Sequence, residues 1–121
     1  MKAVFDTNII IDYLNGEEKS RKEIEMYNHK YISIITYIEV LVGVLDEANE
    51  VIVKNFLASF HMINIEREIA DFATILRKQY RLKIPDALIL ASAQKIGAIL
   101  VTRNTKDLSH DIPIVRIPYE I

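Results

Sequence analysis

Short apolar segments alternate with segments of helical periodicity along the chain. The apolar segments carry the β-branched and aromatic residues of strands, and the others space apolar residues three and four positions apart. This alternation predicts an α/β fold with a mainly parallel central sheet and right-handed crossovers. Because a run such as AILV has no polar side, we expect helices on both faces, in three layers (α/β/α). The predicted strands are 2–5, 31–34, 61–65, 98–102 and 114–117, and the predicted helices are 8–14, 17–28, 37–45, 49–60, 66–80 and 85–96.

Capping residues mark several of the helix boundaries. Asn15-Gly16 and Gly97 suit left-handed helix ends, and Pro85 suits the first residue of a helix. Thr36 precedes the third predicted helix and Glu39 follows three residues later, which is the pattern of a capping box. This pattern gives Glu39 a purely structural interpretation that a functional one must compete with.

The composition fits a single domain spanning 1–121. A chain of 121 residues that is 50% hydrophobic can bury one core but not two. The absence of cysteine excludes disulfides, thiolate zinc sites and cysteine nucleophiles, and fits a reducing cytoplasm. No apolar run reaches the roughly 18 residues of a membrane span and no signal peptide is evident, so we expect a cytoplasmic protein that starts at Met1. The net charge of −2 does not decide whether the partner is a polyanion.

Four acidic residues come from separate segments that the predicted sheet brings to one edge. Asp6 follows the first strand directly, and Glu39 lies in the helix after the second strand. Asp86 is in the first turn of the helix opened by Pro85, and Asp107 follows the AILVT strand. Ligands of open α/β sheets bind at the carboxyl ends of the strands, where the strand order reverses. We therefore predict that these acids line one pocket.

Each of these acids also has a structural interpretation. Asp6 could only form a turn at a strand end, Asp86 could only interact with the helix dipole, and Asp107 is an ordinary loop acid. Chance would have to place unrelated acids at successive strand ends, however, which favours a functional cluster. Like charges this close shift one another's pKa or share a cation.

The composition of the cluster predicts a hard metal ion. Carboxylates without His or Cys favour Mg²⁺ or Mn²⁺, which complete their coordination with water and substrate phosphate oxygens. The corresponding chemistry is hydrolysis of a phosphodiester by a metal-activated water. This route needs no ribose 2′-hydroxyl, so we expect products with 5′-phosphate and 3′-hydroxyl ends.

Four segments in order resemble the motif series of PIN-domain ribonucleases. They are FDTN (5–8), TYIE (36–39), IPDALILASA (84–93) and LVTRNTKDL (100–108). The small size and compact spacing are most similar to the VapC-type toxins of toxin–antitoxin pairs, and the similarity extends from Val4 to Ile117. It implies a single PIN-like domain and an endoribonuclease dependent on Mg²⁺ or Mn²⁺. It also implies a small cognate antitoxin, a homodimer, and a heterotetramer or larger assembly with the antitoxin.

The resemblance also assigns roles to residues by position. Asp6 and Asp86 match the family's most constant metal ligands, and Glu39 matches its third acid. Thr7 and Asn8 match the polar pair that orients the first carboxylate.

The fourth acid is where this chain departs from the pattern. Thr102 matches the hydroxyl at a strand end beside the site. Many relatives have an Asp where Asn104 stands, whereas others use the acid that Asp107 matches. The alternatives therefore stay open at this position, together with the choice between one metal ion and two.

Basic and apolar side chains suggest contacts beyond the acids. Arg103 and Lys106 flank the predicted pocket and are candidates for binding substrate phosphates. A second basic group around Tyr80 could follow an RNA backbone, but a solvated helix end favoured by the helix dipole is the preferred interpretation. The group comprises Arg77, Lys78, Arg81 and Lys83. The three histidines show no ligand spacing, and we expect structural or surface roles for His29, His61 and His110. The helices at 8–14 and 37–45 are apolar on all sides, which indicates denser packing or a surface for a partner helix or a second copy.

Three alternatives to a toxin nuclease follow from the same sequence. The domain could bind RNA or protein without turnover, or process RNA without an antitoxin. A phosphotransfer protein is disfavoured, because an aspartyl-phosphate phosphatase needs an acid where Asn8 stands. A receiver domain needs an adjacent pair of early acids, and 1–15 supplies only Asp6 and Asp12.

Overall fold

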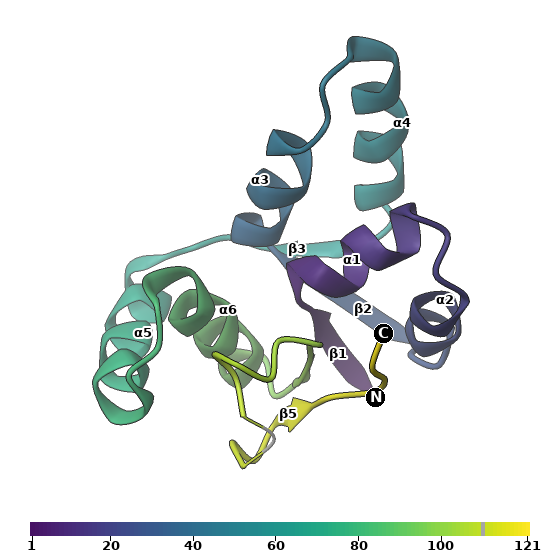
Figure 1. The fold of residues 1–121 in the computed structure, drawn as a ribbon. Coiled ribbons are helices and arrows are strands. Elements are labelled where there is room, and N and C mark those ends of the chain that lie inside the picture. Colours follow the sequence, from purple (N-terminus) through teal and green to yellow (C-terminus); the bar gives the residue numbers. More distant parts are fainter. Residues whose placement is uncertain (110) are drawn as a thin grey trace.

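A computed structural model describes residues 1–109 and 111–121. Five strands form one central sheet, and six helices connect and cover them (Figure 1). The strands are β1 (Lys2–Phe5), β2 (His29–Ser33), β3 (His61–Ile63), β4 (Ile99–Val101) and β5 (Val115–Arg116). The helices are α1 (Thr7–Leu14), α2 (Glu18–Glu25), α3 (Ile34–Val42), α4 (Glu47–Leu57), α5 (Arg67–Tyr80) and α6 (Ile84–Lys95).

All strand pairs within the sheet are parallel, in the order β3-β2-β1-β4-β5. The order therefore reverses between β1 and β4, since the chain first builds outward from β1 and then returns to its other side. The register pairs Phe5 with Val101, so the next residues, Asp6 and Thr102, lie beside each other. The predicted parallel α/β fold is confirmed, with its switch point at Asp6.

The alternation of side chains along the strands divides the core into two layers. Val4 and Leu100 face α5 and α6, whereas Phe5 and Val101 face the side covered by the first four helices. In parallel strands neighbouring side chains point to opposite faces, and both faces need an apolar cover. The three-layer arrangement predicted from the apolar runs is therefore present.

Several helix boundaries differ from the predicted ones. The segment before Glu39 is the clearest case, because Thr36 is buried inside α3 and does not cap it. Ser33 is the N-cap, and its side chain accepts a hydrogen bond from the backbone N–H of Ile35. The β-branched residues at 34–36 look like the end of a strand, which hid the start of the helix. The predicted capping box at Thr36 and Glu39 is wrong.

The predicted left-handed helix ends are confirmed at two glycines. Gly16 and Gly97 have φ of +84° and +69° after α1 and α6, a conformation that costs a side chain about 1 kcal/mol or more. Arg81 ends α5 in the same conformation, with φ of 57°.

Helices α3 and α4 project from the sheet as a pair (Figure 1). Part of the apolar surface of this pair stays exposed, with Val42 at 75% and Leu45 at 96%. The apolar residues of the third predicted helix are therefore only partly used in the core. Within the described residues, no helix is both long enough and apolar enough to cross a bilayer.

Candidate functional site

Asp6 is buried at the switch point of the sheet, between β1 and α1. Its backbone N–H donates to the Val101 carbonyl at 2.9 Å, extending the β1–β4 pairing by one residue. Its carboxylate caps α1, since Oδ1 accepts the Thr7 backbone N–H at 2.8 Å. Oδ2 accepts the Thr102 hydroxyl at 2.7 Å and the Asn8 side-chain amide at 3.3 Å. Three neutral donors therefore fix the carboxylate without neutralising it.

Glu39 reaches the same edge from α3. The Thr7 hydroxyl donates to Glu39 Oε1 at 2.7 Å and lies 3.2 Å from the hydroxyl of buried Thr36. Thr7 therefore connects the first and third acids, with its backbone on Asp6 and its side chain on Glu39. Thr36, which we had predicted to cap the helix, instead lines the site.

Asp107 is held by Asn104. Asn104 Nδ2 donates to Asp107 Oδ2 at 3.1 Å, and Asn104 Oδ1 accepts the Asp107 backbone N–H at 3.2 Å. Lys83, the residue before α6, brings Nζ to 3.6 Å from Asp107 Oδ2. This geometry favours Asp107 as the fourth acid and Asn104 as the residue that orients it.

The electrostatics of Asp86 show that the acids act on one another. Burial, together with the charges of Asp6, Asp107 and Glu39, raises the pKa of Asp86 to about 6, with Lys83 acting in the opposite direction. Burial also raises the pKa of Asp6, despite the hydrogen bonds from Thr102 and Thr7 that lower it. The hydrogen bond from Asn104 and the charge of Lys83 hold the pKa of Asp107 below its usual range. Four acids from four elements thus share one electrostatic environment.

The donor set suits a hard divalent cation, because it is all oxygen and carries more negative charge than Lys83 offsets. Within the described residues, no three acidic or imidazole side chains gather closely enough to hold a metal ion as they stand. Asp6, Glu39 and Asp107 each accept a hydrogen bond from a different neutral side chain, namely Thr102, Thr7 and Asn104. The four acids therefore have the oxygen ligands that a hard divalent cation prefers, but their side chains would have to move closer together to bind one.

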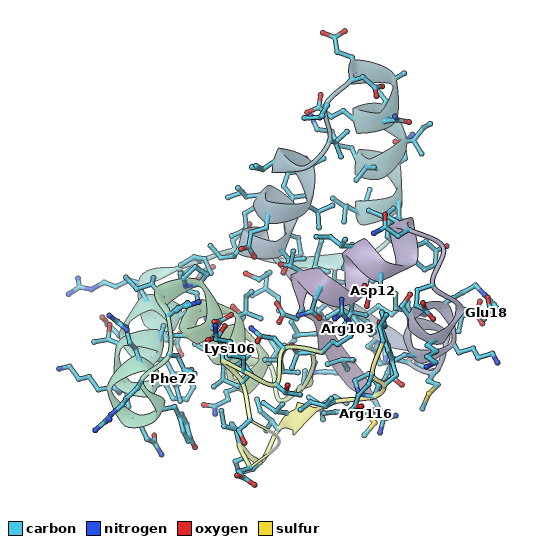
Figure 2. All side chains as sticks on the ribbon, in the orientation of Figure 1. Asp12, Glu18, Phe72, Arg103, Lys106 and Arg116 are labelled. Atoms are coloured by element: carbon cyan, nitrogen blue, oxygen red, sulfur yellow. The ribbon has the colours of Figure 1, made fainter. Side chains whose placement is uncertain are left out.

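Lys106 and Arg103, the two residues predicted to bind substrate phosphates, differ in their contacts. Lys106 is exposed, and its charge reaches Asp107. Arg103 forms a two-pronged ion pair with Asp12 of α1, at 2.8 and 2.9 Å (Figure 2). Substrate binding by both stays a prediction, and sequence reasoning did not find the partner of Arg103.

The structure also shows the contacts or exposure of several other basic residues considered in the sequence analysis. Arg77 Nη1 donates to the Leu82 carbonyl at 2.5 Å, which supports the structural interpretation of the basic group near Tyr80. Lys83 belongs to the site instead. His29 and His61 are exposed, and His110 lies outside the described residues.

A groove lined by both apolar and polar side chains lies between α1 and the α3–α4 pair. It has a volume of about 600 Å³ and includes Ile11 and Leu14 of α1, Val44 and Leu45 after α3, and Ile52 of α4. Tyr13 is not among the residues that line this groove, and its ring stacks on Phe56 at a centroid distance of 4.5 Å.

The fold and the site define a doubly wound α/β domain with a cluster of acids at its switch point. The PIN domain family model matches residues 3–110, and the chain belongs to this family. The match confirms the resemblance to PIN domains that was predicted from the four motifs. Among curated proteins, no sequence matches the chain.

Solved structures with the same fold include several toxin–antitoxin assemblies. A chain of a toxin–antitoxin complex from Klebsiella pneumoniae is 44% identical, with a TM-score of 0.94, over 99% of this chain and 100% of that one. VapBC2 from Rickettsia felis, bound to a promoter DNA fragment, is 23% identical with a TM-score of 0.80 over 96% and 98%. DNA-bound VapBC from Salmonella typhimurium is 23% identical with a TM-score of 0.79 over 97% and 96%. The last two likenesses concern the fold alone.

Proposed function

We propose that this chain is a Mg²⁺- or Mn²⁺-dependent endoribonuclease and the toxin of a toxin–antitoxin pair. The observation that carries the proposal is the buried carboxylate of Asp6, which only neutral groups bind and which is fixed at the switch point. Its charge acts on Asp86, whose pKa is raised by burial and by the neighbouring acids. Membership of the PIN family and the similarity to the Klebsiella pneumoniae complex support it.

The residues would divide the work by position. Asp6, Glu39, Asp86 and Asp107 would hold the cation, which when bound supplies an activated water and stabilises charge at the scissile phosphate. Thr7, Asn8 and Thr102 keep the Asp6 oxygens in a fixed direction, so that one ligand is preorganised before the others converge. Asn104 does the same for Asp107.

Cleavage of a looped RNA by the purified protein tests the enzyme. We expect cleavage with Mg²⁺ or Mn²⁺, 5′-phosphate products, and loss of cleavage in EDTA and in Asp6→Asn. Asp71→Asn is the matched control, because it removes one exposed carboxylate of α5, which forms an ion pair with Arg67 of the same helix. Cleavage that persists in EDTA would reject the metal mechanism, and RNA binding without turnover would favour a binding module.

Growth tests the role as a toxin. We expect induced expression to arrest growth, and both Asp6→Asn and co-expression of the adjacent small gene to relieve the arrest. RNA cleavage in vitro without growth arrest would favour an RNA-processing nuclease that has no antitoxin.

The groove beside α1 is the proposed antitoxin surface. Its exposed apolar side chains suit the apolar face of a partner helix. Val40 lines the groove and directly follows Glu39 in α3, so a basic side chain of that partner would enter the site from this helix. Leu45→Glu is the informative variant because Leu45 is 96% exposed, so the fold tolerates the change. Ile75→Glu, at a 59% exposed position on α5, is the control. Capture of the neighbouring gene product that survives Leu45→Glu would reject this surface.

A further inference from the structure

Asp12 is a buried acid that the proposed chemistry does not use. It lies on α1, six residues after Asp6, and is 6% exposed. Arg103 donates to both of its oxygens, and the Tyr119 hydroxyl donates to Oδ2 at 2.8 Å. Three segments far apart in the chain, namely α1, the loop after β4 and the C-terminal segment, therefore meet at one carboxylate (Figure 2).

This cluster continues into the candidate site through the backbone of Arg103. The Arg103 N–H donates to Asn8 Oδ1 at 3.0 Å. With its oxygen held there, the Asn8 amide turns its Nδ2 donor towards Asp6 Oδ2 at 3.3 Å and Thr102 Oγ1 at 3.4 Å. The position of the Arg103 backbone thus decides which end of the Asn8 side chain faces the Asp6 carboxylate.

We propose that Arg103, clamped by Asp12 and Tyr119, is a positioning residue that orients Asn8 and thereby Asp6. The proposal rests on the nuclease function proposed above and makes the C-terminal segment part of the catalytic unit. Under this proposal the Arg103 guanidinium positions Asn8 and does not bind a substrate phosphate. Its Nε and Nη2 both donate to Asp12. Substitution of a residue that orients a metal ligand typically lowers activity by about 10- to 100-fold.

A second cluster of the same chemistry provides a matched control. Arg116 donates to both oxygens of Glu23 at 2.8 and 3.0 Å, and the Tyr27 hydroxyl donates to Glu23 Oε2 at 2.7 Å. Glu23 is 5% exposed, so its burial is like that of Asp12. Arg116 lies in β5 at one edge of the sheet, and its side chain donates to no acid of the site among the described residues. Its backbone carbonyl accepts the Thr102 N–H at 3.0 Å, a contact that a side-chain substitution leaves in place.

The experiment compares Arg103→Lys with Arg116→Lys, and Tyr119→Phe with Tyr27→Phe, in the full chain. We expect both members of each pair to lose similar unfolding stability in urea. Only Arg103→Lys should lower kcat, by about 10-fold with unchanged KM, and Tyr119→Phe should lower it less. Equal kcat in the Arg103→Lys and Arg116→Lys variants, or a raised KM with normal kcat in Arg103→Lys, would overturn the proposal.

Hydrogen exchange gives a readout that does not depend on activity. The backbone amide of residue 103 donates to Asn8, so its exchange should accelerate by about 10-fold in Tyr119→Phe and stay unchanged in Tyr27→Phe. Unchanged exchange in Tyr119→Phe would show that the clamp does not reach Asn8. If the wild-type protein cleaves no RNA, the proposed function fails, and this measurement still decides the linkage.

Discussion

Two pairs of acidic residues in this fold differ in the groups that bind their carboxylates. Asp12 and Glu23 are buried, and each is bound by an arginine fork and a tyrosine hydroxyl. Asp6 is buried equally well, but only neutral groups donate to it, and Asp86 accepts no hydrogen bond from the described residues. The charges of Asp12 and Glu23 are therefore balanced by protein side chains, whereas Asp6 and Asp86 have no cationic partner that binds them directly among the described residues.

The difference separates acids that hold the fold together from acids kept for a ligand. Removing one partner of a buried ion pair leaves an uncompensated charge, so Asp12 and Glu23 contribute to stability only as members of their clusters. Asp6 and Asp86 repel each other and weaken the metal-free fold, which is a cost that functional sites commonly carry. Burial is the largest cause of the raised pKa of both acids, and the charge of a neighbouring acid adds to it, from Glu39 for Asp6 and from Asp6 for Asp86.

The largest expected effect is on catalysis. Asp86→Asn should reduce RNA cleavage by at least about 100-fold, the lower range for removing a group that acts directly in the chemistry. The same change removes a repelled charge, so the free energy of unfolding at pH 7 should stay equal or increase. Cleavage rates and urea unfolding curves of the same preparation check both statements. A loss of activity accompanied by unfolding would place Asp86 with the structural acids.

The next effect is on stability. Arg116→Met removes the cation from buried Glu23 and should lower the free energy of unfolding by about 2 kcal/mol, less than for a fully buried pair because Arg116 is partly exposed. Chemical denaturation measures the loss. The double variant Arg116→Met with Glu23→Leu should recover stability, since it removes the stranded charge as well. Failure to recover would mean that packing by Arg116, and not its charge, is what matters.

Sequence reasoning predicted the sheet and the placement of the four acids at one of its edges because both follow from local pattern. Parallel strands bring their carboxyl ends to one edge, which places Asp6 directly after β1. A helix that returns to the start of a parallel strand begins at that same edge, which places Asp86 in the first turn of α6 before β4. The start of α3 was misplaced because the β-branched residues at 34–36 resemble a strand, and Ser33 takes the capping role expected of Thr36.

The contacts of Asp12 with Arg103 and Tyr119 could not be predicted from the sequence, because these residues are 91 and 107 positions away from Asp12. One signal was available, since Asp12 is three residues after buried Ile9 and therefore on the core-facing side of α1. An acid on that face needs a cation, but the sequence contains 15 basic residues and does not indicate which one.

A divalent cation should sharpen the contrast between the two pairs. Mn²⁺ at about ten times its Kd should raise the free energy of unfolding by about 1.4 kcal/mol, since only the folded chain brings the acids together. Thermal unfolding with and without Mn²⁺ measures the shift. Asp6→Asn should abolish the shift, whereas Arg116→Met should retain it from a lower starting stability. An equal shift in Asp6→Asn would locate metal binding elsewhere.

The smallest effect is the dependence of stability on pH in metal-free protein. The folded pKa of Asp86 is about 6, above the value of 3.8 for an unperturbed side chain, so between these values the folded state holds a proton that the unfolded chain has lost. The free energy of unfolding should therefore rise as pH falls from 7 to about 4, by about 1 kcal/mol after allowing for solvent screening. The hydrogen bonds from Arg116 and Tyr27 outweigh burial and lower the pKa of Glu23, so its contribution is lost as pH falls further below 4.5.

Stability in EDTA should accordingly pass through a maximum near pH 4 to 5, where Asp86 is protonated and Glu23 is still charged. Urea unfolding across pH 3 to 8 measures this curve. Asp86→Asn should flatten the rise between pH 7 and 4 and leave the acid side unchanged, whereas Asp71→Asn should preserve both arms. A rise that survives in Asp86→Asn would mean that another group, with Asp6 the first candidate because burial raises its pKa, carries the proton at the switch point.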